Sequence, residues 1–469
     1  MSLITDLQNL LGSAHVLTGA DMAAYSRDWM GAYNWTPLAV VRPADRDEVA
    51  AVVKLAASAG VAIVPSAGRT GITGASTAEG ALMVSVERLN RIRAVKPQSR
   101  LAVVEAGVIL SSLHEAAEAQ GLYFPLWFGA RGSAMIGGVL ATNAGGSNVL
   151  RYGSTRGLCL GLEVVLADGR IMDLMSELHK DNSGYDLKDL FIGAEGTLGI
   201  ITAAVMKLVP APRAHATAML ATTSLDAALL LLNRLQEVSG GLVEAFEFMP
   251  GTYQERLAHV RPDLGLPFDR VHDVAILVEL GATAPRDAMP GPDGAIPLMT
   301  LMEEALAEMM EEGLIIDAHL ARSEAQRAAI WERREAAAEI MLGLDHSIDT
   351  DIAVPLDKVG IFLERALTQL KDLDPSAITL TVAHLGDGNL HYSVIPTSGD
   401  AALKDRVVSG IEDIVQDLRG SFSAEHGIGI SKLSSMQRRK DPVALDVMRK
   451  LKAALDPAGT LNPGKVIPD

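Results

Sequence analysis

Three loops rich in glycine and small polar residues interrupt the N-terminal part of the chain, and no other feature constrains the fold as strongly. They read PSAGRTGITG from Pro65, GARGSAMIGG from Gly129 with TNAGG following from Thr142, and GAEGTLG from Gly193. Glycine permits positive φ and close approach of the backbone, so consecutive N–H groups can converge on phosphate oxygens. One such loop is as often a simple tight turn. Three in one segment favour a site for a pyrophosphate.

The common motifs for a dinucleotide or a nucleoside triphosphate are absent from these loops. No G-x-G-x-x-G follows the first strand, and no G-x-x-x-x-G-K-[ST] occurs in the chain. The sequence therefore supports neither a Rossmann site nor a P-loop. A dinucleotide must be held by another arrangement of the backbone.

The N-terminal part of the chain alternates short apolar strands with helices. The strand LAVVRP, a helix opened by Asp45 and the strand VAIVPS form a predicted β-α-β unit. Further strands are predicted at ALMVSV, LAVVEAGV, LGLEVVLADGR and GTLGIITAAVMKLVP. The proline-rich VPAPRA, which ends the segment near Arg213, marks a predicted domain boundary.

Beyond this boundary the pattern changes to strands separated by long helices. ATAMLATT, GLVEAFEFM and DVAILVEL are predicted strands around the helix SLDAALLLLNRLQEVSG, which indicates an antiparallel sheet with helices on one face. The last segment, from SMQRRKDPVALDV on, is predicted to be one amphipathic helix that Pro457 and Gly459 stop. The fold class is therefore α+β, with predicted parts at 1–213 (core 37–213), 214–420 and 421–469.

Length, charge and cysteine content limit the classes of function. A chain of 469 residues exceeds one hydrophobic core and predicts about two to four domains. The net charge of −17 repels nucleic acid and anionic lipid, so neither is expected as a partner. Cys159 is the only cysteine, which excludes an internal disulfide and suits a reducing cytoplasm. We expect no direct membrane span, because no uncharged apolar stretch approaches the ~18 residues that one needs.

The sequence TVAHLGDGNLHYSV predicts a β-hairpin with one histidine on each strand. Its GDGN turn suits a tight connection, so His384 and His391 would lie near each other across the pair. Two imidazoles with a carboxylate form a site for a divalent ion, with Zn²⁺ the first choice and Mn²⁺ or Fe²⁺ the alternatives. Either histidine alone would more often be an ordinary core or surface residue.

The carboxylate is predicted in SAEHGIG, where Glu425 precedes His426. Neighbouring residues of a regular strand face opposite ways, so both side chains can serve one site only where the backbone is irregular. Gly427 and Gly429 permit that irregularity. The sequence thus predicts that Glu425 joins the hairpin histidines as a metal ligand.

A cationic side chain for an acidic substrate is expected, because the chain as a whole is strongly acidic. The helix AAIWERREAAAEIM offers Arg333 and Arg334. Both can equally be solvated helix charges that pair with Glu332 and Glu335. Residue types alone do not choose between the two arginines.

Four blocks, in order along the chain, carry a resemblance to a known superfamily. PSAGRTGITG, FPLWFGARGSAMIGGVLATNAGGSNVLRYGSTRG, LGLEVVLADGR and KDNSGYDLKDLFIGAEGTLGIIT resemble the FAD domain of the vanillyl-alcohol oxidase and p-cresol methylhydroxylase superfamily. Within it, the chain looks like the D-lactate, D-2-hydroxyglutarate and glycolate dehydrogenase branch, from roughly Asp28 to Val466. The resemblance implies a two-subdomain FAD-binding domain at 1–213, an antiparallel-sheet cap or substrate domain with the metal hairpin at 214–420, and a C-terminal helical segment that completes the active site.

The resemblance also implies which residues contact FAD. No His or Cys stands in the first loop to link the flavin covalently, so non-covalent FAD is expected. On matching positions the contacts would be Ser66, Gly68, Arg69, Thr70, Gly71, Gly74, Gly129, Ser133, Gly137, Gly138, Thr142, Asn143, Gly145, Gly146, Gly196, Ile200 and Asn462.

The metal and substrate motifs of this branch have counterparts here. H-x-G-D-G-N-x-H and E-H-G-x-G are similar to its metal motifs, which implies His384, His391 and Glu425 as ligands and His426 as the catalytic base. The pattern W-x-x-R-E implies Arg334 as the residue that binds the substrate carboxylate.

Relatives specific for 2-hydroxyglutarate would further have a Lys near Asp349, a Thr near Ala338 and an Asn near Ser393. This chain has none of the three, which leaves lactate-like, malate-like and aliphatic D-2-hydroxy acids open. Lost polar contacts of this kind can change discrimination by orders of magnitude.

The function predicted from these features is an FAD-dependent dehydrogenase that oxidises a D-2-hydroxy acid to the 2-oxo acid. A metal would polarise the substrate hydroxyl, His426 would take its proton, and the hydride would pass to flavin N5. An electron-transfer flavoprotein, a quinone-linked carrier or a cytochrome would reoxidise the flavin, and relatives imply a homodimer. The alternatives are a glycolate-oxidase-type flavin subunit that works only in a complex, a metal-dependent hydrolase and a non-catalytic nucleotide-binding regulator.

Overall fold

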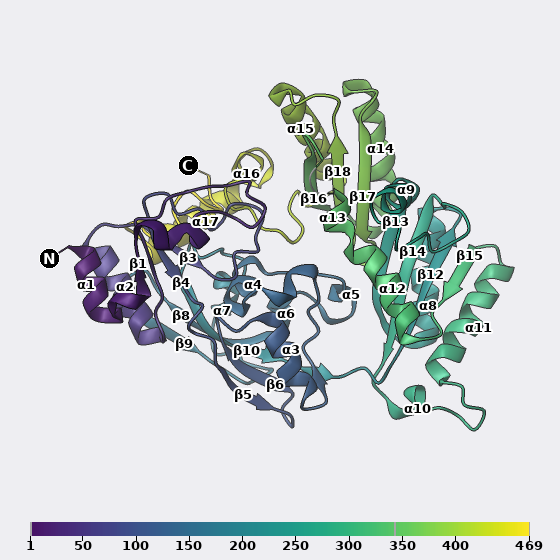
Figure 1. The fold of residues 1–469 in the computed structure, drawn as a ribbon, viewed down its shortest axis with the longest axis horizontal. Helices are drawn as coiled ribbons and strands as arrows, with labels where there is room; N and C mark the ends of the chain where they lie inside the picture. The colour runs from purple at the N-terminus through teal and green to yellow at the C-terminus, as the bar shows by residue number, and fades with distance from the viewer. Residues whose placement is uncertain (1, 342–343, 469) are drawn as a thin grey trace. The chain divides into compact units, whose positions relative to one another are not determined.

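The computed structural model describes residues 2–341 and 344–468, which form two compact units (Figure 1). Unit 1 comprises the residues up to Gly145, Gly153–Pro210 and the residues from Glu425 on. Unit 2 comprises Gly146–Tyr152 and Ala211–Ala424. The three-part division read from the sequence stays a prediction.

Unit 1 contains two main sheets and a two-stranded ribbon. The four-stranded sheet has the order β1-β2-β4-β3, with β2, β4 and β3 parallel and β1 antiparallel to β2. The five-stranded sheet has the order β5-β6-β10-β8-β9 and is antiparallel throughout. The strands are β1 Val16–Leu17, β2 Ala39–Val41, β3 Ile63–Ser66, β4 Leu82–Ser85, β5 Ile92–Lys96, β6 Leu101–Glu105, β7 Leu122–Tyr123, β8 Cys159–Val165, β9 Ile171–Leu174, β10 Ile200–Lys207 and β11 Val209–Pro210.

The predicted β-α-β unit is confirmed in the four-stranded sheet. Asp45 caps α2 (Arg46–Ser58), because its side chain accepts the backbone N–H groups of Asp47 and Glu48 at 3.0 and 2.8 Å. The strands before and after this helix, β2 and β3, both pair in parallel with β4. The other helices of unit 1 are α1 Leu3–Leu11, α3 Leu110–Glu118, α4 Ile136–Thr142, α6 Thr155–Leu158, α7 Lys188–Phe191, α16 Leu433–Arg439 and α17 Pro442–Leu455.

The C-terminal segment forms two helices, so the prediction of a single amphipathic helix is wrong. α16 ends at Arg439 and α17 begins at Pro442, with Asp441 as its N-cap. Proline lacks an N–H group and disfavours the helical conformation of the residue before it, which separates the helices. After α17 the chain returns to β3, where Leu461 forms a parallel bridge with Ile63.

Unit 2 is built on one antiparallel sheet of seven strands in the order β15-β12-β14-β13-β17-β18-β16 (Figure 1). The antiparallel sheet predicted for this part of the chain is confirmed. The strands are β12 Ala214–Thr222, β13 Val243–Pro250, β14 Val274–Ala282, β15 Ile315–Leu320, β16 Ile348–Ala353, β17 Ile378–His384 and β18 Asn389–Ile395.

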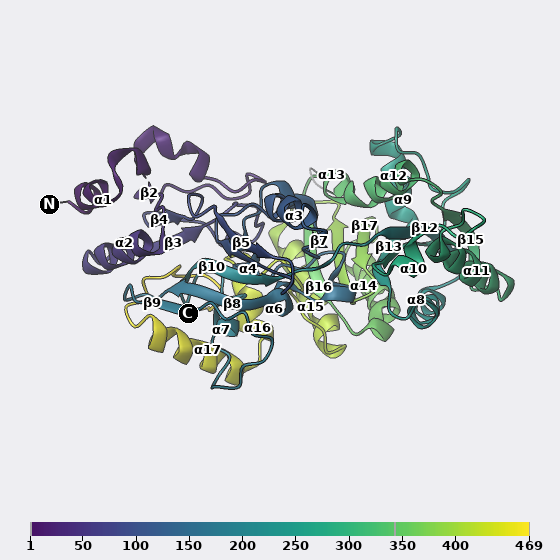
Figure 2. The ribbon, with the colours of Figure 1, turned by 90° about the horizontal axis from the view of Figure 1, so that it is seen from below.

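Helices cover both faces of this sheet, so the prediction of helices on one face is wrong. Figure 2 shows α9, α12 and α13 on one side of the strands and α8, α14 and α15 on the other. β12 shows the reason, because Ala218 and Leu220 belong to the large apolar core while Met219 and Ala221, which face the opposite way, belong to a second cluster. The helices are α5 Val149–Tyr152, α8 Leu225–Ser239, α9 Gly251–Val260, α10 Pro285–Ala288, α11 Pro297–Glu311, α12 Glu324–Glu335, α13 Ala337–Met341, α14 Val359–Leu373 and α15 Ala401–Asp417.

The second face of the sheet is apolar only in part. On β13, β14, β17, β18 and β16, strand alternation turns polar side chains toward this face, while the residues between them enter the large core. The polar side chains are Glu247, Glu279, His384, His391 and Asp351. No helix in the described part of the chain has the length and apolar character needed to cross a bilayer.

Candidate active site

The predicted hairpin is present in unit 2 and brings its two histidines together. β17 ends at His384, which pairs with Asn389 at the start of β18. The rings of His384 and His391 have centroids 5.4 Å apart and planes at 81°. Gly388 makes the turn possible, because its φ is +80° and a Cβ there would lie 2.2 Å from the carbonyl oxygen of Val354. The predicted hairpin, with one histidine on each strand, is confirmed.

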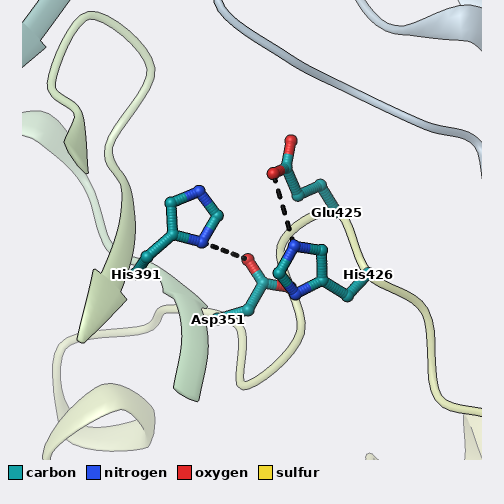
Figure 3. Close-up of side chains that lie close together, drawn as sticks. All are labelled: Asp351, His391, Glu425 and His426. Atoms are coloured by element: carbon teal, nitrogen blue, oxygen red, sulfur yellow. Dashed lines mark ion pairs between the residues drawn. The ribbon is translucent and has the colours of Figure 1, made fainter. Parts of the chain in front are cut away.

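Four side chains able to bind a metal ion lie together in one group, which includes His391 of the hairpin but not His384: Asp351, His391, Glu425 and His426 (Figure 3). Each offers one ligand atom, and these atoms all lie within 4.8 Å of one another. Oδ1 of Asp351 lies 3.9 Å from Nδ1 of His391, and Oε1 of Glu425 lies 3.6 Å from Nε2 of His426. Carboxylate oxygens and imidazole nitrogens form a donor set that suits Zn²⁺, Mn²⁺ or Fe²⁺.

An irregular backbone places the neighbours Glu425 and His426 in the same group. They follow Ala424, whose N–H group donates to the backbone oxygen and to Oδ2 of Asp351, each at 3.2 Å. Two of the next three residues are glycines with φ of +80° and +52°. The backbone irregularity that the sequence required of this segment is confirmed.

Asp351 is a site residue that sequence reasoning missed. It lies in β16 opposite His391 of β18. Its Oδ1 also accepts a hydrogen bond from the side chain of Asn389 at 2.9 Å. The only available signal was the alternation of apolar and acidic residues in IDTDIA, which is typical of a strand with one polar face.

His384 is anchored by a second missed residue, the buried Glu247 of β13. Nδ1 of His384 lies 2.8 Å from Oε1 of Glu247, and the two residues are register partners between β17 and β13. Nε of Arg334, from α12, donates to Oε2 of the same carboxylate at 2.8 Å. Burial opposes ionisation of Glu247, but the charges and hydrogen bonds of His384 and Arg334 outweigh it and hold its pKa below the usual value.

The two candidate arginines, Arg333 and Arg334, differ in their hydrogen-bond partners. Arg333 donates to the backbone oxygens of Leu264, Gly265 and Ala329, so its guanidinium is used in local structure. Arg334 is 8% exposed, and its Nη2 is buried without a hydrogen-bond partner among the described residues. An unpaired buried donor of this kind costs free energy unless a ligand satisfies it. Arg334 is therefore the better placed of the two to bind an anionic ligand.

The three glycine-rich loops converge within unit 1. A Cβ on Gly68 would lie 2.2 Å from the carbonyl oxygen of Ser133, which shows how closely the first loop approaches the second. Gly193 donates its N–H to the oxygen of Leu140 at 3.0 Å, which joins the third loop to the second. Gly196, with φ of +75°, leaves room for Pro65 of the first loop. Such convergence supports a common ligand site and speaks against three independent turns.

Two predicted FAD contacts carry buried polar atoms that have no partner among the described residues: Oγ of Ser66 and Oδ1 of Asn462. Ser66 ends β3 and is 2% exposed. Asn462 donates from Nδ2 to the backbone oxygens of Ala75 and Glu195 at 3.1 and 2.7 Å. Orphaned polar atoms at the meeting point of the loops fit a polar ligand such as a dinucleotide.

The remaining candidate FAD residues lie in or beside the same loops. The first loop holds Arg69, whose φ is +54° and whose guanidinium lies 4.3 Å from the ring centre of Tyr25. The others are Thr70, Gly71 and Gly74 in the first loop, Gly129 at the start of a short 3-10 helix, Gly137, Gly138 and Thr142 in α4, Asn143 as the C-cap of α4, Gly145 and Gly146 just after it, and Ile200 at the start of β10.

Glu195 of the third loop is a further residue that the sequence did not reveal. Its two carboxylate oxygens accept the backbone N–H groups of Ile428 and Gly429 at 2.7 and 2.9 Å. Burial raises the pKa of Glu195, against the effect of these two hydrogen bonds. The third loop thereby holds the segment that follows Glu425 and His426. A single glutamate inside a glycine-rich loop gives no sequence signal for this contact.

Comparison with known protein families supports a flavin-dependent class. Residues 37–175 match the family model described as FAD binding domain, and residues 211–466 match the C-terminal domain of FAD linked oxidases. The fold is similar to p-cresol methylhydroxylase with substrate bound, with a TM-score of 0.74, 14% identity and coverage of 100% of this chain and 96% of that one. It is also similar to alkyldihydroxyacetonephosphate synthase, with a TM-score of 0.72, 17% identity and coverage of 98% and 84%.

Comparison with individual sequence relatives narrows the flavin-dependent class further. The chain is 35% identical to a D-2-hydroxyglutarate dehydrogenase of Stutzerimonas stutzeri, over 99% of this chain and 98% of the relative. It is 36% identical to a D-2-hydroxyglutarate dehydrogenase of Xanthomonas citri, over 95% and 93%. A mitochondrial D-2-hydroxyglutarate dehydrogenase of Bos taurus is also 36% identical, over 94% and 79%.

Fold and family models together define an FAD-linked oxidoreductase that acts on a CH–OH group. Within that class, the chain belongs to the family of FAD-linked D-2-hydroxyacid dehydrogenases. The family resemblance and the α+β fold class inferred from the sequence are confirmed. The individual site residues stay predictions.

Proposed function

We propose that the chain oxidises a D-2-hydroxy acid to the 2-oxo acid with a divalent ion, Zn²⁺ first, held by His384, His391 and Glu425. Bound FAD supplies the acceptor for the hydride at N5, and the ion supplies a Lewis acid toward the substrate hydroxyl. One observation carries the proposal: Glu247 contacts both an imidazole of the hairpin and Arg334. A metal-binding group and a carboxylate-binding group are thereby held by the same buried side chain.

The chain's own residues would divide the work of binding and proton transfer. Arg334 would hold the substrate carboxylate, which is supported by its buried and unpartnered Nη2. His426 would take the hydroxyl proton, which is supported by its place in the group with Asp351, His391 and Glu425. General-base catalysis by a positioned histidine can contribute ~10² to 10⁴ in rate. The orphaned oxygens of Ser66 and Asn462 support non-covalent FAD at the converging loops.

We further propose a substrate with a single carboxylate, lactate-like or longer aliphatic, although the relatives are named for 2-hydroxyglutarate. Asp349 lies two residues before Asp351 on the same face of β16. It accepts hydrogen bonds from the hydroxyls of Ser347 and Ser393 at 2.7 and 2.6 Å. The family resemblance would require a lysine near this position, and a carboxylate here repels a second substrate carboxylate.

Anaerobic mixing of the purified flavoprotein with D- and L-2-hydroxy acids tests the function directly. We expect D-lactate and D-2-hydroxybutyrate to bleach the flavin absorption, while their L-enantiomers do not. Failure of every D-acid would overturn the proposed function. Faster bleaching by D-2-hydroxyglutarate than by the monocarboxylic acids would overturn only the substrate proposal.

The proposal also covers the electron acceptor, the oligomeric state and the cellular compartment. The reduced flavin would pass its electrons to a protein carrier, such as an electron-transfer flavoprotein or a quinone-linked carrier. We propose a homodimer in the cytoplasm. The reducing compartment is supported by Cys159, the only cysteine, which is buried.

A further inference from the structure

Glu247 lies where three separate elements of unit 2 meet. It comes from the middle of β13 and is completely buried. One carboxylate oxygen contacts Nδ1 of His384 at the end of β17, and the other accepts Nε of Arg334 from α12, each at 2.8 Å. A buried carboxylate is costly unless both oxygens are satisfied. Here each oxygen has a partner that the proposed function uses.

The contact with His384 fixes which nitrogen of its ring can bind a metal. A neutral imidazole carries one proton, and a carboxylate at Nδ1 holds that proton there. The metal would then be bound through Nε2. Carboxylate partners of this kind orient metal-binding histidines and raise the basicity of the ligand nitrogen. His391 has a similar neighbour, since Oδ1 of Asp351 lies 3.9 Å from its Nδ1.

The contact with Arg334 fixes the direction of its guanidinium. Arginine presents its five N–H donors in a rigid plane, so anchoring Nε sets where the two terminal nitrogens point. Glu247 accepts from Nε, and Nη2 is the buried nitrogen without a partner among the described residues. The guanidinium is thus held at Nε and keeps Nη2 for a ligand carboxylate.

We propose that Glu247 is a positioning residue of the active site, which sets the tautomer of His384 for metal binding and holds Arg334 for the substrate carboxylate. The inference rests on the proposed function and adds that metal binding and substrate binding both depend on Glu247. Because one carboxylate serves both groups, its loss weakens metal binding and substrate binding together. Loss of either partner alone would weaken mainly one of the two.

The same helix offers a matched control. Arg327 lies seven residues before Arg334 on α12, so both point toward the same face. It pairs with the buried Glu279 of β14 through Nε at 2.7 Å and Nη2 at 2.8 Å. Trp331 and Thr217 complete the hydrogen bonds of that carboxylate. This second pair has the same chemistry, but its carboxylate lies in a separate group of possible metal ligands with His215 and Glu244.

The experiment compares Glu247→Gln with Glu279→Gln in the full-length flavoprotein. Glutamine keeps the volume but has one acceptor oxygen, so it cannot accept from both His384 and Arg334. Affinity of the metal-stripped protein for Zn²⁺, measured against a competing chelator, should fall ~10- to 100-fold in Glu247→Gln. At saturating Zn²⁺ its KM for D-lactate should rise on the order of tenfold or more. Zn²⁺ bound by His215, Glu244 and Glu279 would be a second event, which the stoichiometry of the titration separates from the first. In Glu279→Gln, KM and the Zn²⁺ affinity of the group around the hairpin should stay within about twofold of wild type.

Flavin absorption and the thermal midpoint report whether each variant folds. If Glu247→Gln does not fold, Glu247→Asp keeps the charge but is one methylene too short to hold both partners, and the same losses are expected. Unchanged Zn²⁺ affinity in a folded Glu247 variant would overturn the inference. A wild-type protein that needs no metal would instead overturn the proposed function, so the two failures are distinguishable.

Discussion

The two faces of the seven-stranded sheet in unit 2 have opposite chemistry. One face carries Phe246, Leu390 and Tyr392 into a core closed by α8, α11, α14 and α15. The other face carries a smaller apolar cluster, which includes residues of β12, β13 and β14. It also carries a row of acids and histidines on β14, β13, β17, β18 and β16. Because strand side chains alternate, each strand contributes to both faces at once. The comparison shows that one face mainly provides stability and that the proposed chemistry lies on the other.

The largest expected effect is on the apolar face. Phe362 of α14 is fully buried and packs edge-on against Tyr392, with ring centroids 5.5 Å apart. Phe362→Ala should lower the free energy of unfolding by about 3–5 kcal/mol, because it leaves a cavity. Urea denaturation measures this loss. The neighbouring Ile361 is 42% exposed, and Ile361→Ala should change the same quantity by only about 0.5 kcal/mol. Equal losses in the two variants would contradict the assignment of this face to stability.

The next effect is on the polar face and should be larger on catalysis than on stability. His384→Ala removes a proposed metal ligand, so kcat/KM for the D-2-hydroxy acid should fall by ~10² to 10³, or about 3–4 kcal/mol. The protein should stay yellow and folded. His319→Ala, at an exposed position of the edge strand β15, is the control and should keep full activity. Full activity of metal-depleted His384→Ala would rule out a catalytic role for the hairpin.

A smaller effect should come from the charge at position 349. Asp349→Lys replaces a carboxylate on the polar face by a cation and should raise kcat/KM for D-2-hydroxyglutarate by about tenfold, or about 1.4 kcal/mol. Steady-state kinetics with D-lactate as the second substrate separates specificity from general activation. Asp372→Lys makes the same charge change on α14 and should alter neither value. A gain with both substrates, or with both variants, would refute the specificity argument.

The smallest expected effect concerns the ion pair of Arg327 and Glu279, which should make the stability of the fold depend on pH. Burial opposes ionisation of Glu279, but the hydrogen bonds and charge of Arg327 outweigh it and hold its pKa below the usual value. A depressed carboxyl pKa stabilises the fold above the unfolded value and loses this contribution as the pH falls. The difference in thermal midpoint between wild type and Glu279→Gln should therefore be largest near neutral pH and shrink below about pH 4.5, the reference value for Glu. A difference that grows in acid would contradict this sign.

The local parts of the fold could be read from the sequence. Asp45 marked the start of α2, and the GDGN turn marked the hairpin, because caps and tight turns depend on neighbouring residues. The break at Pro442 was overlooked, although the proline itself was the signal. The covering of the second sheet face was also missed, since it depends on packing between elements.

The candidate site was readable where its residues carry motifs. His384, His391, Glu425 and His426 stand in two short segments whose glycines announce special backbone geometry. The choice between Arg333 and Arg334 was different, because both arginines have the same neighbours in the sequence. The structure shows different partners for the two, with backbone oxygens around Arg333 and a buried carboxylate beside Arg334.

By itself the sequence determined the loops and the hairpin, and it supplied candidate residues for binding metal and substrate, because these follow from residue type and short-range spacing. Only the tertiary structure decided that Glu247 stands beside His384, 137 residues away, and that Asp351 stands opposite His391. Strand register and sheet order bring such residues together. Both are set by the packing of the whole sheet, and no local pattern encodes them.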